Sequence, residues 1–311
     1  MKIRRTEDLV DHVKALGWRT NIAVAAANDA VAIKTIHEAW SRGIVDATLV
    51  GPAMEIRRIA DALAVDIDRF CLIDTATDAE SVRTCIQLVR SGECEVMMKG
   101  RLRTADLMVE LLRKEHGLRT ERIVSHVGAF TAPGEDRIMI ITDAGINIAP
   151  DLARKRDIVL NAVDVMHALG YERPGVAALS FIEKIEHKGL QKGVKQATLD
   201  AEHLTEMSRQ GKLSGCIVEG PYALDNAISR HAAEHKGIQG EVAGRADILL
   251  AHDINMGNAI YKALQIWVKV VFAGVVVGSK TPVVVPSRVD SPESKLQSIA
   301  LAMLLMKKNA G

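Results

Sequence analysis

The sequence predicts an α/β protein with mostly parallel sheets. Short apolar runs recur along the 311 residues, and stretches with helical periodicity separate them. Many of these runs show no alternation of apolar and polar residues, which is typical of strands that helices cover on both faces. Strands that alternate with helices indicate parallel sheets joined by right-handed crossovers.

The predicted strands are spread over the whole chain. We expect them at residues 22–27, 47–50, 95–98, 122–125, 138–142, 176–180, 216–219, 248–251, 273–278 and 283–286.

Two of the predicted helices have clear signals at their ends. Pro150 suits a first helical position, Asp151 complements the positive end of the helix dipole, and Gly170 supplies a stop. The basic run 154–156 of this helix is flanked by acidic residues, and we interpret it as a solvated face. The last helix, from about 292 to 306, carries an apolar stripe.

The length of the chain indicates two domains, because 311 residues exceed what one compact core usually holds. The sequence has no repeat, no low-complexity segment and no linker rich in Pro, Gly or Ser. We therefore expect the boundary at a crossover of a continuous chain, near Asp143, after the strand at 138–142.

Composition excludes several classes of function. The net charge of +1, with 48% hydrophobic and 25% charged residues, is typical of an ordered globular protein and lacks the basic excess of a nucleic-acid binder. The N-terminus has no apolar signal core, and Lys269 interrupts the longest apolar stretch, whereas a membrane span needs about 20 apolar residues. We expect a cytoplasmic protein with no membrane or nucleic-acid partner.

The cysteines give no support to a zinc or redox centre. Cys71, Cys85, Cys94 and Cys216 form no Cys-x-x-Cys pair, and we interpret them as buried free thiols.

Ligands of open α/β sheets bind at the carboxyl ends of the strands, so the loops there are candidate sites. The loop after the strand at 95–98 offers three basic residues, Lys99, Arg101 and Arg103. It also has the hydroxyl of Thr104, and Gly100 allows close backbone approach. This composition suits an anion at a helix N-terminus. An ordinary helix start with exposed bases is the alternative.

Three further loops carry small and polar residues after a predicted strand. Their candidate ligand-binding residues are Asp143 and Asn147, then Asp225 and Asn226, then Asn255, Gly257 and Asn258. Amide side chains and exposed backbone N–H groups hold phosphates or thioester oxygens, although helix-capping turns have the same composition. The adjacent pair His252 and Asp253 is a poor ligand set, and we expect no metal.

The segment 278–281 resembles a phosphate-binding P-loop only superficially. Ser279 separates the glycine from the lysine, and Pro282 stands where the helix should begin. No Gly-x-Gly-x-x-Gly fingerprint occurs. Ser287 and Arg288 follow the last predicted strand, and an arginine at that point is suited to binding a phosphate.

Four segments together resemble the phosphate acetyl/butyryltransferase family. They are an Asp-x-x-x-Asn-x-x-Pro segment at 143–150, a Gly-Pro-x-Ala-x-Asp-Asn-Ala motif of the butyryl branch at 220–227, an ADILL-x-x-D-x-x-x-GN segment at 246–258, and a Ser-Arg segment at 287–296. The resemblance covers nearly the whole chain and is densest from Met97 to the end.

The resemblance implies two α/β domains with an interdomain cleft and an isocitrate/isopropylmalate dehydrogenase-like fold. It also implies that the C-terminal segment returns to the first domain, which gives residues 1–143 plus 279–311 and residues 144–278. The implied activity converts a short-chain acyl-CoA and inorganic phosphate into an acyl phosphate and coenzyme A. Coenzyme A is then a substrate, no cofactor is bound permanently, and the protein forms a homodimer or larger homo-oligomer.

Roles follow for the residues that match. We expect Arg288 to clamp phosphate and Ser287 to donate a hydrogen bond to the thioester carbonyl or the departing sulfur. The anion site is completed by Lys99, Arg101 or Thr104, and the opposite wall is lined by Asn255, Gly257 and Asn258. The acetyl branch has an aspartate as the base soon after the Ser-Arg pair; Ser294 stands there in this chain, which favours the butyryl branch.

Two other functions and one other mechanism are open from the sequence. A metal- and NAD-dependent dehydrogenase-like enzyme shares the fold but needs a cluster of aspartates for its cation. A non-catalytic acyl-CoA sensing protein would keep the glycine-rich loops without needing the Ser-Arg pair. A covalent route through Cys94 or Cys216 is the mechanistic alternative.

Overall fold

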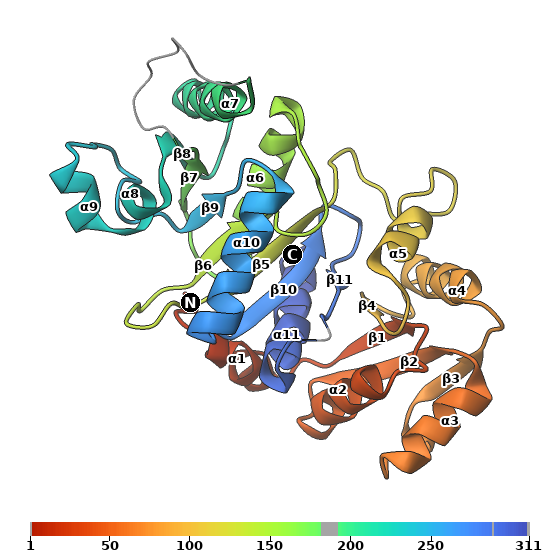
Figure 1. Ribbon diagram of the computed structural model, residues 1–311. Helices are drawn as coiled ribbons and strands as arrows, with labels where there is room; N and C mark the ends of the chain where they lie inside the picture. Colours follow the sequence, from red (N-terminus) through yellow and green to blue (C-terminus); the bar gives the residue numbers. More distant parts are fainter. Residues whose placement is uncertain (1, 182–191, 288, 310–311) are drawn as a thin grey trace. The chain divides into compact units, whose positions relative to one another are not determined.

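The computed structural model describes residues 2–181, 192–287 and 289–309. They form two compact α/β units (Figure 1). The flanking unit comprises Thr6–Arg122 and Val271–Gly311, and the central unit comprises Met1–Arg5 and Ile123–Val270. The changes of unit after Arg122 and after Val270 come earlier in the chain than the expected boundaries near residues 143 and 278. The first is earlier because the strand at 139–142 pairs with two strands of the central unit, and the second because the strand at 272–277 pairs with the strand at 283–284 of the flanking unit.

The sheet of the flanking unit is parallel except for one strand. Its order is β3-β2-β1-β4-β11-β10, and β10 runs antiparallel to β11. The strands are β1 (Thr20–Ala25), β2 (Val45–Gly51), β3 (Cys71–Asp74), β4 (Val96–Lys99), β10 (Phe272–Val277) and β11 (Val283–Val284). Because β1 pairs with both β2 and β4, the first strand of the chain lies inside the sheet.

Helices cover both faces of this sheet (Figure 1). They are α1 (Leu9–Ala15), α2 (Ala30–Ser41), α3 (Ala53–Ala62), α4 (Asp78–Ser91), α5 (Thr104–Leu111) and α11 (Pro292–Asn309), with 3₁₀ turns at Thr6–Asp8 and Ile67–Arg69. On one face α4 packs against α5, and on the other α2 contacts α3 and α11. The last helix also contacts α1 and β10, so the two ends of the chain pack together in this unit.

The strand arrangement of the central unit is also mostly parallel. Its order is β5-β6-β9-β7-β8, and only β5 runs antiparallel to its neighbour β6. The strands are β5 (Ser125–Phe130), β6 (Met139–Thr142), β7 (Gly175–Leu179), β8 (Ile217–Tyr222) and β9 (Ile248–Leu250).

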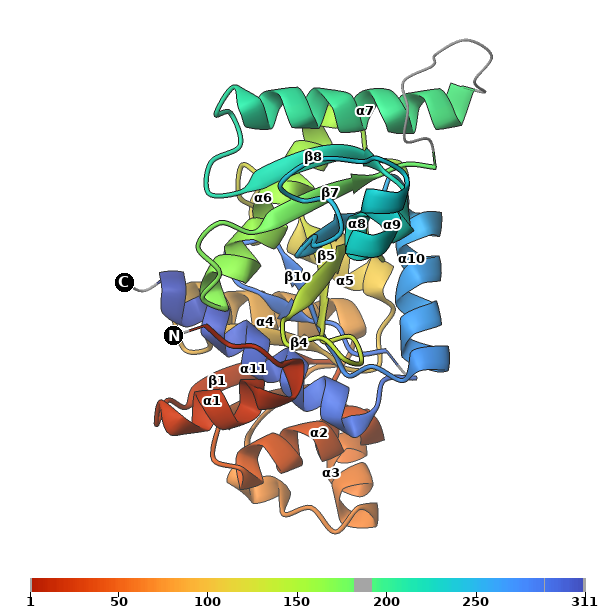
Figure 2. The same cartoon turned by 90° about the vertical axis from the view of Figure 1, so that its left-hand side faces the viewer.

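The helices of the central unit follow its parallel strands. They are α6 (Leu152–Ala168), α7 (Lys192–Arg209), α8 (Leu224–Ile228), α9 (Arg230–His235) and α10 (Ile254–Ala263), and a π-helical turn at Leu264–Val268 continues α10. Figure 2 shows α7 lying along β7 and β8, and α6 contacts α7. The predicted α/β class with mostly parallel sheets is therefore confirmed.

Three details differ from the expected elements. The strand expected at 122–125 is β5 at Ser125–Phe130, where a glycine and a histidine conceal the strand pattern. No strand was expected at β3, whose residues are half-exposed or exposed. Pro150 lies outside α6, because Asp151 is the N-cap and its carboxylate accepts a hydrogen bond from the Arg154 N–H.

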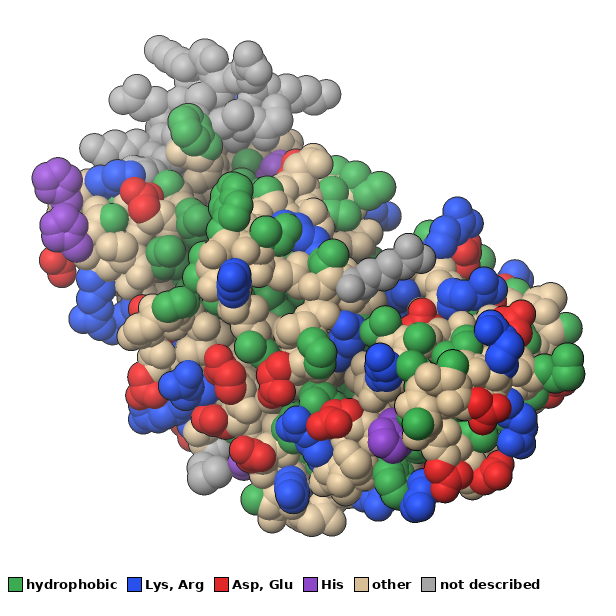
Figure 3. Space-filling model, turned by 60° about the horizontal axis from the view of Figure 1, so that its bottom comes forward, with side chains coloured by type: hydrophobic (Ala, Val, Ile, Leu, Met, Phe, Trp, Pro, Cys, Tyr) green, Lys and Arg blue, Asp and Glu red, His purple; other side chains and the backbone are tan. Residues whose placement is uncertain are grey.

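The surface has charges of both signs and no membrane-spanning helix among the described residues. Acidic and basic side chains alternate over the face seen in Figure 3. No described helix is both long and apolar enough to cross a bilayer.

A buried glutamine joins the two ends of the chain within the flanking unit. Gln297 of α11 is fully buried. Its Oε1 accepts a hydrogen bond from the Val10 N–H at 3.1 Å, and its Nε2 donates to the Glu7 carbonyl at 2.9 Å and to the Glu293 carboxylate. This side chain therefore links α11 to the backbone near the start of the chain.

We expect Gln297→Met to lower the free energy of unfolding by about 1–3 kcal/mol, because it removes the acceptor of the buried Val10 N–H. Urea unfolding measures the change. Gln210→Met makes the same chemical change at an exposed position after α7 and should stay within about 0.5 kcal/mol of wild type. Equal losses in the two variants would contradict this account of Gln297.

Candidate functional site

The carboxyl ends of three neighbouring parallel strands form one edge of the flanking sheet. Val24 of β1 and Val284 of β11 both stand opposite Met98 of β4. The chain runs from β1 outward to β3 and returns on the other side of β1 as β4, so the strand order reverses at this point. Such a switch point is where open α/β sheets bind ligands.

Gly100 is required by the approach of one strand-end loop to another. Its N–H donates to the Ala25 carbonyl at 2.8 Å, and the Arg101 N–H donates to the Ala26 carbonyl at 3.0 Å. A Cβ on Gly100 would lie 2.2 Å from the Ala26 oxygen. The close backbone approach expected at Gly100 is thus made to the loop after β1.

The bases of this loop differ in what they contact. The Lys99 ammonium donates to the carbonyls of Gly100 and Leu102, at 3.2 and 3.0 Å, and so stabilises its own loop. Arg101 is 57% exposed and lies 3.9 Å from the carboxylate of Asp78. Thr104 is the first residue of α5. Because that contact is long, Arg101 is well placed to bind an external anion.

The Arg103 guanidinium forms two hydrogen bonds of 2.8 Å with the Asp106 carboxylate. Both side chains stand in the first turn of α5, and their contact neutralises the charge of Arg103. The exposed positive charge of the loop is therefore carried mainly by Arg101.

Ser287 is held in a tight turn after β11. Its N–H donates to Oδ2 of Asp290 at 2.6 Å, and the Lys295 ammonium donates to the Asp290 carbonyl. Ser287 is half-buried, and Arg288 lies outside the described residues. The aspartate nearest to the predicted Ser-Arg pair thus fixes the position of the serine.

Ser294, which stands where the acetyl branch has its base, is a buried residue of the first turn of α11. Its hydroxyl accepts a hydrogen bond from the Phe272 N–H at 3.2 Å, and its own N–H donates to Oγ of Ser291 at 3.0 Å. These bonds join α11 to β10. Ser294 therefore has a structural role, because its hydroxyl and its backbone N–H both form hydrogen bonds within the fold.

In the central unit, Asp143 closes the loop after β6. One carboxylate oxygen accepts from the N–H groups of Gly145 and Ile146 at 2.9 and 3.0 Å. The other accepts from the backbone N–H and the side-chain amide of Asn147 at 3.1 and 2.6 Å. Since only 2% of Asp143 is exposed, its carboxylate positions the loop.

The loop after β9 packs directly on this loop, as expected for neighbouring parallel strands. A Cβ on Gly257 would lie 2.2 Å from the Asp143 carbonyl oxygen. The Asn258 amide donates to the Ala144 carbonyl at 3.2 Å. Asn255 is exposed in the first turn of α10, where Asp253 caps the Met256 N–H. The structure therefore brings two of the three central candidate loops together.

The third loop lies elsewhere in the central unit. Asp225 is exposed and pairs with the Lys236 ammonium at 2.9 Å. Asn226 is fully buried, and its carbonyl accepts from the Gly244 N–H at 2.6 Å. Gly244 leads into the amino end of β9, whereas Asn255 and Gly257 follow the carboxyl end.

A buried cluster of Lys155, Asp200 and His252 was missed from the sequence. The Lys155 ammonium lies 2.5 Å from Oδ2 of Asp200 and 2.7 Å from Nδ1 of His252, and Lys155 is only 2% exposed. The interpretation of 154–156 as a solvated face is therefore wrong for Lys155. The basic run is broken at this residue by a partner on α7, and no spacing in the sequence indicates that partner.

The cluster shifts the titration of two groups. Burial lowers the pKa of Lys155, although the Asp200 carboxylate opposes this shift. Burial also lowers the pKa of His252, and the nearby Lys155 ammonium adds to the effect. Since an ammonium only donates, Nδ1 of His252 accepts and Nε2 carries the hydrogen. His252 is thus a neutral N–H donor at the carboxyl end of β9.

The cysteines are poorly suited to nucleophilic catalysis. Cys85, Cys94 and Cys216 are buried, as expected, whereas Cys71 on the edge strand β3 is exposed, contrary to expectation. Burial raises the pKa of both Cys94 and Cys216 to about 11, so their thiolates are scarce at neutral pH. No group of three metal-ligating side chains occurs in the described ranges.

Comparisons with known proteins agree on one family. Residues 79–303 match the model of the phosphate acetyl/butaryl transferase family. The chain is 40% identical to the phosphate butyryltransferase of Clostridium acetobutylicum over 97% of this chain and 98% of that protein. It is also 40% identical to the phosphate acetyltransferase of Thermotoga maritima, over 95% of this chain and 98% of that protein.

Solved structures show the same likeness. A branched-chain phosphotransacylase from Enterococcus faecalis superposes with a TM-score of 0.79 at 28% identity, covering 92% of this chain and 99% of that one. A 4-hydroxythreonine-4-phosphate dehydrogenase from Klebsiella pneumoniae, at 15% identity and a TM-score of 0.57, shares the fold alone, over 93% of this chain and 99% of that one. The expected dehydrogenase-like fold is confirmed.

The contact between the two central loops gives a matched pair of variants. Gly257→Ala forces a Cβ against the Asp143 carbonyl and should lower the free energy of unfolding by about 2–4 kcal/mol. Gly145→Ala in the partner loop meets nothing nearer than 3.8 Å and should cost less than about 1 kcal/mol. Thermal or urea unfolding of both variants decides, and equal stabilities would show that the loops do not pack this tightly.

The lowered pKa of His252 predicts how the stability of the protein depends on pH. The folded protein keeps the imidazole neutral, whereas the unfolded chain protonates it below about pH 6.5. The unfolded state therefore binds the extra proton, and stability falls as pH drops through 6.5. In His252→Asn, whose side-chain oxygen keeps an acceptor for Lys155, this part of the pH dependence should disappear.

Urea midpoints measured between about pH 5 and pH 8 test this difference. His116→Asn removes an exposed histidine of the flanking unit and should keep the wild-type slope. The account fails if His252→Asn and wild type have the same slope.

Proposed function

Because the chain belongs to the phosphate acetyl/butaryl transferase family it is a phosphate acyltransferase, and we propose that it moves a short acyl group between coenzyme A and inorganic phosphate. A phosphate oxygen attacks the thioester carbonyl carbon, the new C–O bond forms, and the C–S bond breaks. Coenzyme A leaves as a thiolate that takes up a proton. The products are an acyl phosphate and free coenzyme A.

The observation that carries the proposed site is the pairing of β4 with β11. Val283 and Val284 stand opposite Met97 and Met98 in a parallel register. The basic loop that starts at Lys99 and the segment that leads to Ser287 therefore leave the sheet from paired strands, although they come from distant parts of the chain. We assign the phosphate and the reacting end of the thioester to this edge of the flanking unit.

In this proposal Arg288 binds phosphate, and Arg101 adds a second positive charge. The hydroxyl of Ser287 donates to the thioester carbonyl oxygen, where negative charge develops in the tetrahedral intermediate. The turn held by Asp290 supports this role, because a hydroxyl contributes most when its position is fixed before the reaction. Lys99 and Gly100 contribute indirectly, because they stabilise the conformation of the loop that carries Arg101.

The chemistry does not require a strong protein base. Phosphate is already an oxyanion, and a departing thiolate with a pKa near 8.5 needs only modest help from a nearby positive charge. The burial of Ser294 is compatible with a reaction that needs no strong protein base. The raised pKa values of the buried thiols argue against an acyl-cysteine intermediate.

We propose that the transferred acyl group is acetyl, butyryl or a group of intermediate length. The relatives named for butyryl and for acetyl transfer are equally similar to this chain, while the Gly-Pro motif at 220–227 and Ser294 favour the butyryl branch. One methylene in a pocket is worth about 1–3 kcal/mol, so a series of acyl chains separates the choices.

We propose further that the protein is a homodimer or larger homo-oligomer. An apolar segment at the end of α10 supports this. Ile266, Trp267 and Val268 are 59%, 83% and 44% exposed, and large apolar side chains that adjoin one another on a surface are typical of interfaces.

The test is phosphate-dependent release of the coenzyme A thiol from acetyl-, propionyl-, butyryl- and isobutyryl-CoA. We expect release only with phosphate, a maximum at one chain length, and a loss in kcat/KM of about 100-fold or more in Arg288→Ala and Ser287→Ala, because each removes a group that stabilises the transition state. Arg154→Ala removes an exposed arginine of α6 and should keep the wild-type rate.

Unfolding curves must show that both site variants are folded. Absence of release from every acyl-CoA by the folded wild type would sink the acyltransferase assignment and favour a sensing protein. Full activity in Arg288→Ala would keep the reaction but remove the proposed clamp.

A further inference from the structure

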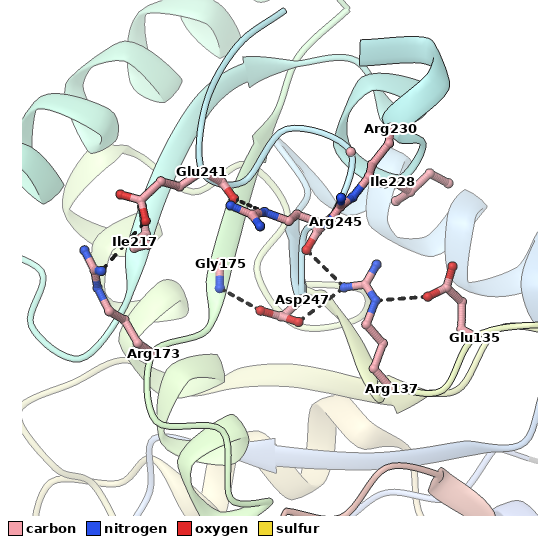
Figure 4. A pocket seen from close by; sticks show the side chains of 11 residues that line it. Glu135, Arg137, Arg173, Gly175, Ile217, Ile228, Arg230, Glu241, Arg245 and Asp247 are labelled. Carbon is pink, nitrogen blue, oxygen red and sulfur yellow. Dashed lines mark hydrogen bonds and ion pairs between the residues drawn. The ribbon is translucent and has the colours of Figure 1, made fainter. Parts of the chain in front are cut away.

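A hollow lies at the other edge of the central sheet, at the amino ends of its parallel strands (Figure 4). Its volume is about 700 Å³. Gly175 and Ile217, the first residues of β7 and β8, line it, and so does Asp247, which directly precedes β9. The candidate residue Asn255 follows the carboxyl end of β9, and that strand alone spans about 10 Å. The hollow is thus distinct from the loops that carry Asp143 and Asn255, and it adjoins the loop of Asn226, whose carbonyl accepts from the Gly244 N–H.

Four arginines and three carboxylates line the hollow, and the carboxylates are already engaged. Asp247 accepts from Arg137 at 3.2 Å and from the Gly175 N–H at 2.9 Å. Glu135 accepts from Arg137 at 3.0 Å. Glu241 is 3.8 Å from Arg173. Arg137 also donates to two backbone carbonyls, so Arg137 and Asp247 form a fixed floor.

The other two arginines, Arg230 and Arg245, are not paired with the carboxylates of the hollow. Within the described ranges, no carboxylate lies within ion-pair distance of either guanidinium. Arg245 donates from Nε to the Glu241 carbonyl at 2.5 Å, which fixes the side chain and leaves both terminal nitrogens for another partner. The hollow therefore has an excess of positive charge at these two residues.

The backbone places these two arginines next to each other. Gly244 has φ +70°, and a Cβ there would lie 2.5 Å from the Cα of Arg230. Its N–H donates to the Asn226 carbonyl at 2.6 Å, and the Ala246 N–H donates to the Ala227 carbonyl at 2.9 Å. Only a glycine permits this contact, so the juxtaposition of the two arginines is built into the chain path.

Arg230 and Arg245 also border a second, smaller hollow of about 300 Å³. Ala233, Ile238 and Ala243 supply its apolar lining, and Glu234 and Gln239 also line it. Both arginines therefore line a polar hollow and a more apolar one. A ligand that carries an anionic group on an organic body matches this arrangement.

We propose that these hollows form a binding site for an organic phosphate of nucleotide size, with Arg230 and Arg245 as the ligands of the phosphoryl group. Two neighbouring guanidinium forks suit a doubly charged tetrahedral anion. The volume falls in the range of small-molecule sites, and Ile217 and Ile228 supply apolar surface for the organic part. The site lies apart from the loops that carry Asp143 and Asn255.

The test is calorimetric titration of the whole protein with ADP in the absence of coenzyme A, which carries an adenosine diphosphate moiety of its own. We expect binding that weakens with added salt and that falls at least about tenfold in the double variant Arg230→Gln/Arg245→Gln. Adenosine, which lacks the phosphoryl groups, should not bind. The matched double variant Arg154→Gln/Arg209→Gln removes two exposed arginines of α6 and α7 and should bind ADP as wild type does.

The same titration distinguishes this site from the proposed acyl-transfer site, because it uses no turnover. The proposal is overturned if the arginine double variant binds ADP unchanged, since ADP then occupies another site, such as the substrate site. It is also overturned if ADP does not bind at millimolar concentration. Unfolding curves of both double variants establish that each is folded.

Discussion

Parallel pairing of the strands is the constraint on which the arrangement of the candidate residues depends. Parallel neighbours cannot be joined by a tight turn, so each crossover carries the chain back along the sheet. All carboxyl ends then meet at one edge. In the flanking unit this places the loop after β4 beside the turn after β11. In the central unit it places the loop after β6 against the loop after β9.

Many polar groups at these edges serve the loops themselves. Asp143, Asp290 and Lys99 each bind backbone groups of their own segment. A ligand gains from this arrangement because the loops do not have to be ordered when it binds. Among the described residues, the groups that remain for recognition include the Ser287 hydroxyl, the Arg101 guanidinium and the exposed Asn255.

The sequence was sufficient for the fold class because apolar runs and helical stripes record burial directly. The family motifs were also sufficient for the reaction, since they cover loops whose composition is unusual. Lys155 shows the limit. Its neighbours in the sequence are exposed bases, and only the tertiary approach of Asp200 and His252 makes a buried lysine stable there.

Asp225 and Asn226 show a related limit. The motif groups them with the other strand-end residues, but the chain path after β8 carries Asn226 to Gly244, near the opposite end of β9. A sequence pattern identifies a loop, but it does not fix the direction in which the loop leaves the sheet.

The discontinuity of the flanking unit has a consequence for synthesis on the ribosome. Strand β4 has β1 on one side, but its other neighbour β11 consists of Val283 and Val284, near the end of the chain. The central unit, apart from its first residues, is one uninterrupted stretch. During translation the nascent flanking sheet therefore has an unpaired edge until nearly all of the protein has emerged, while the central unit already has its strands. Protection of that edge is a task for the cell.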